Sequence, residues 1–421
     1  MHNDWKCCLE EVVVSLQSYD VASVRGLYTS LSDGWTYMNA HDCPQIPERV
    51  SAAVARSFRM STAVARPEPR VGSHARPTVG VPEGQSFLFD ARSAIADLCN
   101  VSPERVVLGP SLPVLYSALV LAMRPLFRHR SSVVVCNADR PVLTDALARC
   151  AEDAQLRWAQ TDLATGDVPA WQFGELVDGS TRLVAVPAAH EVLGSVVRVA
   201  DIADTVRDRS RAWVLADVSA YAPYYLMDFD SFGADILGID VAELGGPQVA
   251  ALVFRDEAMF GRLDMSALQL DVSTGLAGGV SAIVDHYARL VEESGRRKTR
   301  RNRLEFSMGL TQRYMRGLRD DLHTFLGTLP SVHIVGVSGE AAEGSHMEHT
   351  PRLVFGVHGV PAETVHQRLF ANGIVSTPAP TTPLLQDMGV AEMGGAVAVG
   401  LGPFNTEVDI EQLIRTVASL A

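Results

Sequence analysis

The sequence predicts an α/β protein, with a large domain built on a mostly parallel sheet sandwiched by helices and a smaller α+β domain at its C-terminal end. Short apolar runs without polar alternation recur along residues 105–254, and helical patterns separate most of them. Strands that are covered on both faces need such runs, and their alternation with helices favours a parallel sheet. After about residue 300 a long amphipathic helix and two strands replace this pattern, which predicts the second domain.

The expected elements follow from these runs in chain order. We expect the large-domain strands at residues 105–108, 132–136, 182–186, 213–216, 235–239 and 249–254, and helices at 112–128, 142–151 and 199–208. In the second domain we expect a helix over 303–329, strands over 332–335 and 352–357, and helices over 362–372 and from 408 onward. We expect loops over 66–84 and 339–351. The predicted units are an N-terminal arm that contributes to the small domain (1–60), the large domain (61–300) and the small domain (301–421).

Composition excludes several function classes. The formal charge of −13 over 421 residues argues against nucleic-acid binding, which needs clustered basic surface. The longest apolar stretch, around residues 113–123, is shorter than the roughly 20 residues that span a bilayer. Residues 1–17 do not have the pattern of a signal peptide. We therefore expect a cytoplasmic protein that does not bind membranes or nucleic acid. We expect no metal site, because His346 and His349 lie in a glycine-bearing loop without a third ligand.

Several segments resemble one protein family in order and spacing. They are residues 35–40 (WTYMNA) with 44–50, residues 91–98 with 102–109, residues 180–194, residues 214–217 and residues 404–407 (FNTE). Together these segments are similar to the class V aminotransferases, in the branch that contains the cysteine desulfurases and isopenicillin-epimerase-like proteins. The resemblance implies fold type I of the pyridoxal-phosphate (PLP) enzymes. It also implies a homodimer whose active sites lie at the subunit interface.

The residue that would attach the cofactor differs from the family pattern. Family members hold PLP through a lysine in an S-x-H-K segment shortly before a Gly-Pro pair. The matching residues 240–243 read DVAE, so Glu243 falls at the lysine position and Asp240 at the serine position. The whole chain has two lysines, Lys6 and Lys298, and neither follows a strand that would face a ligand. A Schiff base needs an amine, which a carboxylate does not supply.

Other positions that the resemblance assigns to the cofactor or substrate also differ. Arg140 falls near the ring-stacking histidine, Glu191 beside His190 replaces an asparagine, and Ala398 replaces the arginine for a substrate carboxylate. Asp217 keeps the position that pairs with the pyridine nitrogen. The altered phosphate turn contains Ser111, and Thr274 matches the threonine that reaches the neighbouring subunit's phosphate.

These substitutions predict an acidic crevice at the carboxyl ends of the strands. The carboxylates would oppose a dianionic phosphate at about 1 to 4 kcal/mol per close unpaired contact. They are Glu191, Asp217, Asp240 and Glu243. We therefore expect that PLP is disfavoured, that the protein has no cofactor and that the crevice suits a neutral or cationic ligand.

The favoured function is an enzyme that acts without covalently bound PLP on an amine-bearing small molecule, in specialised metabolism. The predicted reaction is an isomerisation, elimination, cyclisation or hydrolysis by acid/base chemistry. The predicted catalytic residues are Glu243 as acid or base, Asp217, and Arg140 as stabiliser of negative charge. The predicted substrate-binding residues are Glu191, Asp240, His190, Ser111 and Thr274. The alternatives are a non-catalytic partner or regulatory subunit of this fold, and a protein that binds PLP non-covalently.

Overall fold

The computed structural model describes residues 19–64, 80–151, 154–291, 299–336 and 348–420. Its central feature is a seven-stranded sheet in the order β2-β8-β7-β6-β5-β3-β4. The strands are β2 (Val106–Gly109), β3 (Ser132–Cys136), β4 (Gln155–Ala159), β5 (Thr181–Pro187), β6 (Trp213–Asp217), β7 (Ile236–Asp240) and β8 (Ala250–Phe254). Strands β4, β3, β5, β6 and β7 run parallel, and β8 is antiparallel to both β7 and β2. The predicted mostly parallel sheet is confirmed.

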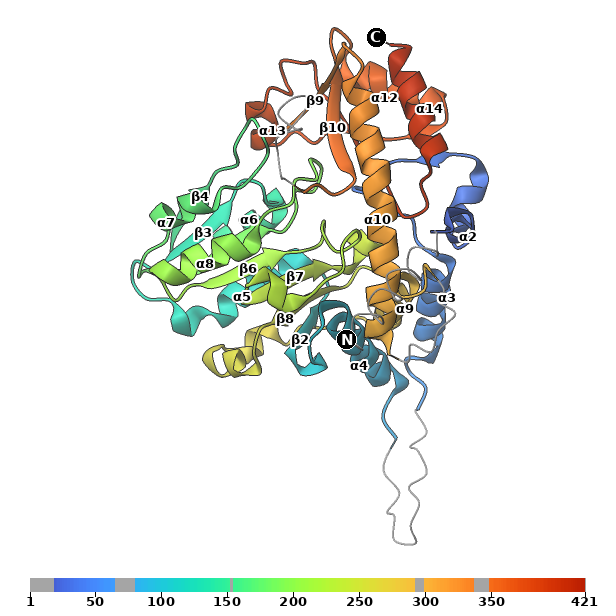
Figure 1. Cartoon of the computed structure of the whole chain (residues 1–421). Helices are drawn as coiled ribbons and strands as arrows, with labels where there is room; N and C mark the ends of the chain where they lie inside the picture. The colour runs from blue at the N-terminus through green and yellow to red at the C-terminus, as the bar shows by residue number, and fades with distance from the viewer. Residues whose placement is uncertain (1–18, 65–79, 152–153, 292–298, 337–347, 421) are drawn as a thin grey trace, which may run out of the picture.

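Helices cover both faces of this sheet (Figure 1). One buried layer includes α4 (Glu83–Cys99), α8 (Val199–Arg209) and α9 (Thr274–Tyr287), and the other includes α5 (Leu112–Ala122) and α6 (Pro141–Cys150). Successive strand residues point to opposite faces, so Val134 packs in the first layer while Val133 and Val135 pack in the second. This double covering explains why the strands are continuous apolar runs.

A four-stranded sheet lies above the seven-stranded one in Figure 1, in the order β12-β13-β10-β9. Its antiparallel strands are β9 (Val332–Ile334), β10 (Arg352–Val357), β12 (Thr377–Pro378) and β13 (Val397–Gly400). It packs with α12 (Ala362–Ala371) and α14 (Glu407–Ala418) in a third apolar cluster. The chain also forms two short helices, α7 (Phe173–Leu176) and α13 (Pro383–Asp387).

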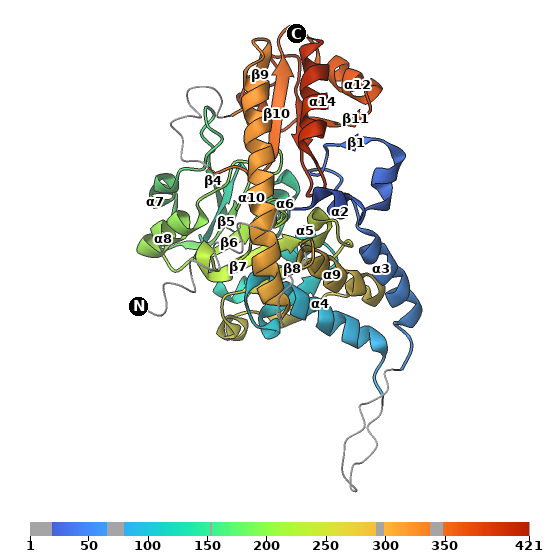
Figure 2. The same cartoon turned by 45° about the vertical axis from the view of Figure 1, so that its right-hand side comes forward.

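Two segments connect the sheets. The long helix α10 (Arg300–Gly327) runs alongside both, as Figures 1 and 2 show from two sides, and it contacts α4, α9, β9 and α14. The chain before α4 forms α2 (Val21–Arg25), β1 (Thr36–Tyr37) and α3 (Glu48–Met60). Strand β1 pairs in parallel with β11 (Ile374–Val375), beside the four-stranded sheet. The N-terminal segment therefore joins the C-terminal part of the chain, while the domain boundaries themselves stay a prediction.

Some elements differ from the sequence-based expectation. Strands β4, β12 and β13 were not expected, and the expected strand at 332–335 is shorter. Part of the expected loops, residues 66–79 and 339–347, lies outside the described residues. Strand β4 is an edge strand with exposed Gln155 and Trp158, so it does not have the apolar run on which the expectation relied. None of the helices in the described ranges combines the length and apolarity that crossing a membrane would require.

Candidate functional site

Four neighbouring strands of the large sheet end in polar residues at one edge. Asp139 and Arg140 follow β3, Glu191 follows β5, Asp217 is the last residue of β6 and Asp240 is the last residue of β7. The order β7-β6-β5-β3 places these strand ends side by side. The structure therefore forms the acidic crevice at the carboxyl ends of the strands.

Local turns hold these side chains in place. Asp217 Oδ1 accepts hydrogen bonds from the Ser219 backbone N–H, at 3.0 Å, and from the Ser219 hydroxyl, at 2.5 Å. The same hydroxyl accepts the Asp240 backbone N–H at 2.9 Å, which ties the ends of β6 and β7 together. Asp240 Oδ1 in turn accepts the Ala242 backbone N–H at 3.1 Å and caps the short helix η6 (Val241–Leu244) that carries Glu243.

Arg140 lies at the centre of the cluster, at the N-terminal cap of α6. Its Nε donates to Asp217 Oδ2 at 3.1 Å, and its terminal nitrogens lie 3.8 Å from Asp240 Oδ2 and 3.7 Å from Glu243 Oε1. Burial lowers the pKa of Arg140, but the carboxylates around it outweigh burial and raise the pKa above its usual value. A permanently charged guanidinium therefore neutralises part of the acidic crevice.

A second arginine, which the sequence did not indicate, approaches from the four-stranded sheet. Arg352, the first residue of β10, is fully buried and donates to Glu243 Oε2 at 3.3 Å and to the Glu191 carbonyl at 2.8 Å. Its Nε lies 3.3 Å from the Tyr224 hydroxyl. Glu243 therefore lies between two guanidinium groups, one from each sheet.

Several of the acids hold their protons more tightly than isolated carboxyls do. Burial, with the nearby Asp217 carboxylate as the next cause, raises the pKa of Asp139 to about 8. Burial is also the main cause that raises the pKa of Glu191 and of Asp240, although Arg140 opposes it at both. With Asp139, the crevice thus has a group that holds its proton near neutral pH, as acid/base chemistry needs.

The remaining predicted residues are not brought together in the same way. His190 Nδ1 accepts the backbone N–H groups of Val192 and Leu193, and burial, with Arg352, lowers the pKa of His190 to about 4. It is a neutral turn residue. Ser111 stands directly before α5 without a capping side-chain hydrogen bond, and neither Ser111 nor Thr274 is among the residues that line the crevice cavity. Thr274 begins α9 and lines a separate cavity with Leu88 and Arg92 of α4.

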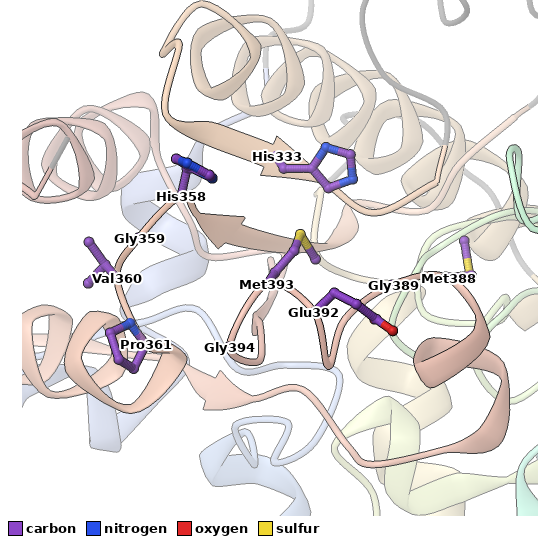
Figure 3. Close-up of a pocket in the computed structure, with 10 residues that line it drawn as sticks. All are labelled: His333, His358, Gly359, Val360, Pro361, Met388, Gly389, Glu392, Met393 and Gly394. Carbon is purple, nitrogen blue, oxygen red and sulfur yellow. The ribbon is translucent and has the colours of Figure 1, made fainter.

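The cavity in the crevice is small. It has a volume of about 10 Å³, which is the space of one water molecule, and Asp139, Arg140, Glu191, Asp217 and Glu243 line it together with Ser219 and four small or cyclic residues. A larger cavity of about 680 Å³ lies in the C-terminal region, where the loop with Met388, Glu392 and Met393 faces His333 and His358 (Figure 3). In the described part of the chain, no three histidine, cysteine, aspartate or glutamate residues gather as metal ligands would.

Comparisons with known proteins identify the family of this chain. Residues 83–260 match the model of the class V aminotransferases. Uncharacterized protein MT3887 of Mycobacterium tuberculosis is 37% identical over 418 residues, which cover 96% of this chain and 100% of that protein. The chain belongs to the class V aminotransferase family. Aminotransferase-like protein FGM3 of Gibberella zeae is 27% identical over 169 residues, 39% of this chain and 42% of that protein.

The class V assignment agrees with the fold. The apo cysteine desulfurase of Thermococcus onnurineus NA1 superposes with a TM-score of 0.76 at 16% identity, over 95% of this chain and 97% of that one. Cysteine desulfurase CsdA of Escherichia coli superposes with a TM-score of 0.73, also at 16% identity, over 95% and 98% of the two chains. The α/β architecture of PLP fold type I, predicted from the sequence, is confirmed.

Family membership corrects the prediction about the cofactor. We expected no cofactor, with PLP disfavoured. That prediction is wrong, because the class V aminotransferases and the cysteine desulfurases of similar fold are PLP-dependent enzymes, and no comparison indicates that this chain has lost the cofactor. The expected repulsion between the crevice carboxylates and the phosphate of PLP was counted from the sequence alone. That count left out the Arg352 guanidinium, which also lies beside Glu243.

The donor set of this crevice nevertheless does not fit covalent attachment of PLP. The side chain that extends from η6 between the two sheets is the Glu243 carboxylate, and both lysines of the chain lie outside the described residues. Asp217, which would pair with the pyridine nitrogen, has both oxygens occupied by Ser219 and Arg140.

Sequence reasoning missed three groups of the site. Asp139 directly precedes a predicted site residue and follows a predicted strand, so its position was a usable signal. Ser219 stands two residues after Asp217, in the spacing of an Asx-type turn. Arg352 had no local signal, because only the packing of β10 against the crevice brings it to Glu243.

Proposed function

We propose that this class V family member acts on an amine-bearing small molecule by acid/base chemistry, without a covalent bond between a crevice lysine and a cofactor. One observation carries the proposal: carboxyl groups from four adjacent strand ends meet at one cavity, where Glu243 lies between Arg140 and Arg352. The sequence resemblance aligns Glu243 with the family's lysine. Acids outnumber arginines there, which favours a cationic or amine ligand over an anionic one.

The side chains suggest a division of roles. Glu243 and the carboxyls with raised pKa values exchange protons with the substrate, while Arg140 stabilises negative charge that develops in the transition state. Asp217 holds the Arg140 guanidinium in position through Nε. An isomerisation, elimination, cyclisation or hydrolysis is within reach of this set, and a place in specialised metabolism is part of the proposal.

The experiment combines a turnover screen with a test of the cofactor. The purified protein is incubated with amino acids, primary amines and amino sugars, and products are followed by mass spectrometry, beside Glu243→Gln. Turnover of an amine that Glu243→Gln lowers by at least tenfold would support the proposal. In parallel, PLP is added and the sample is reduced with borohydride. A pyridoxyl group that is covalently bound to the chain after reduction would overturn it.

A second candidate is a non-catalytic partner of this fold. The observation that favours it is the cavity of about 10 Å³, much smaller than the roughly 300 to 1,000 Å³ of ordinary ligand sites. On this reading the ion pairs around Arg140 replace a ligand. Absence of turnover across the amine panel, together with association with an active family member, would favour this candidate.

The proposal includes a homodimer with the active site at the subunit interface. Exposed apolar side chains cluster on α3 and α4, where Phe58 is 54% and Phe89 is 58% exposed. Helix α9, which Thr274 begins, packs against both of these helices. A second copy that covers this face would bury the aromatic side chains and meet Thr274.

A further inference from the structure

The small cavity has dimensions and lining that suit one chemical group. Its volume of about 10 Å³ holds a single water-sized group. An ammonium head, –NH3⁺, has that size, whereas a trimethylammonium or guanidinium group exceeds it. Four carboxyl-bearing residues, Asp139, Glu191, Asp217 and Glu243, line the cavity, with Arg140 as its cation.

Asp139 has a buried carboxyl oxygen to spare. Its side chain is 5% exposed, and its Oδ1 accepts the Arg140 backbone N–H at 2.8 Å. Within the described residues, its buried Oδ2 has no hydrogen-bond partner. Buried polar atoms are rarely left unpaired, so the orphaned oxygen indicates a missing hydrogen-bond partner. By contrast, Asp217 and Glu243 already pair with arginines.

We propose that this cavity is a primary-ammonium subsite, in which Asp139 Oδ2 accepts the ligand's N–H group. The inference rests on the proposed function and narrows its substrate class to amines with an unsubstituted –NH3⁺ head. Because Arg140 already occupies the centre of the cluster, the ammonium group enters the cavity beside the guanidinium.

Binding must displace a proton. The groups that face Asp139 are the Asp217 and Glu191 carboxyls, the Arg140 guanidinium, the buried Tyr116 hydroxyl and the buried Cys136 thiol. Burial and then Asp217 raise the pKa of Asp139 to about 8, so its carboxyl is protonated in the free protein at pH 7. When R–NH3⁺ binds, the O–H bond of Asp139 breaks, its proton passes to solvent, and an N–H···O hydrogen bond to the carboxylate forms. Affinity therefore rises from pH 6 to pH 8 and levels off above the pKa.

The test uses the whole protein and methylammonium chloride as the probe, with tetramethylammonium and potassium chlorides at equal concentration. At 0.2 M, methylammonium is expected to raise Tm by about 2 °C more than either control salt at pH 8, and by less at pH 6. Asp139→Asn should lose this difference, and the same exchange at the exposed Asp387 should keep it. In weakly buffered wild-type protein at pH 7, methylammonium should also release up to one proton per chain, which an indicator dye reports without any variant.

Equal effects of potassium, a shift that survives in Asp139→Asn, or no proton release would each overturn the subsite. These outcomes are separable from failure of the proposed function. Turnover of an amine without a methylammonium effect removes the subsite and leaves the function standing. A methylammonium effect that depends on Asp139, without turnover of any amine, removes the proposed function and leaves the subsite standing.

Discussion

The Arg352 guanidinium lies 3.3 Å from Glu243 Oε2, and this ion pair connects the first residue of β10 to the short helix after β7. Arg352 is 1% exposed, so its charge is fully desolvated and its partners must satisfy it. They are Glu243, the Glu191 carbonyl and the Tyr224 hydroxyl. The pair therefore holds the two sheets together at the crevice, and it fixes the Glu243 carboxylate in place.

Replacing Arg352 by methionine should destabilise the protein by about 3 to 5 kcal/mol, because it leaves Glu243 Oε2 and the Glu191 carbonyl without their donor. Urea unfolding followed by circular dichroism measures the change. The matched control is Arg198→Met, whose side chain is 69% exposed and should cost within about 0.5 kcal/mol. Equal effects of the two substitutions would contradict a structural role for the Arg352 pair.

Glu243→Lys introduces a lysine at the position that the sequence resemblance aligns with the family's lysine, and it should be poorly tolerated. The ammonium group would stand between two guanidinium groups, where the carboxylate now lies 3.7 Å from Arg140 and 3.3 Å from Arg352. We expect the lysine variant to be less stable than Glu243→Gln by about 2 kcal/mol, since like charges repel at this range. Chemical denaturation of both variants decides the matter, and a lysine variant as stable as the glutamine variant would argue that the crevice readily accepts an amine at this position.

Asp139→Asn should change how stability depends on pH. The folded-state pKa of Asp139, about 8, lies above the unfolded value near 3.8. The contribution of Asp139 to the free energy of unfolding is therefore fully present below pH 3.8 and is lost as pH rises toward 8. The wild type should therefore lose up to about 1.4 kcal/mol per pH unit relative to the variant over this window. Unfolding free energies at pH 5, 6.5 and 8 measure this difference. A constant difference would show that Asp139 does not titrate there.

Phe89→Asp should convert a dimer into a monomer. The substitution puts a charge on the exposed apolar face of α4, where a partner copy would have to desolvate it. Light scattering coupled to size-exclusion chromatography measures the mass. Trp171→Asp is the control, because Trp171 is 69% exposed and lies next to α7, away from α3 and α4. A wild-type protein that is already monomeric would remove the proposed interface.

The crevice shows which site features local sequence can predict. Asp217, Asp240, Glu191 and Arg140 all lie at or shortly after the ends of apolar strands. In a parallel sheet the ends of neighbouring strands meet, so their convergence was predictable. Ser111 and Thr274 were assigned from family resemblance alone. In the structure they lie at the starts of α5 and α9, and neither lines the crevice cavity of this chain.

The sequence by itself determined the fold class, the order of most strands and helices, and the absence of a lysine after β7, because these depend on apolar periodicity and on residue identity. The tertiary structure decided the charge balance and the size of the crevice. Arg352 is more than 100 residues from Glu243 along the chain, and only the packing of the four-stranded sheet against the seven-stranded one brings them together. Long-range ion pairs and burial set the protonation of the crevice acids, and neither is encoded in local sequence pattern.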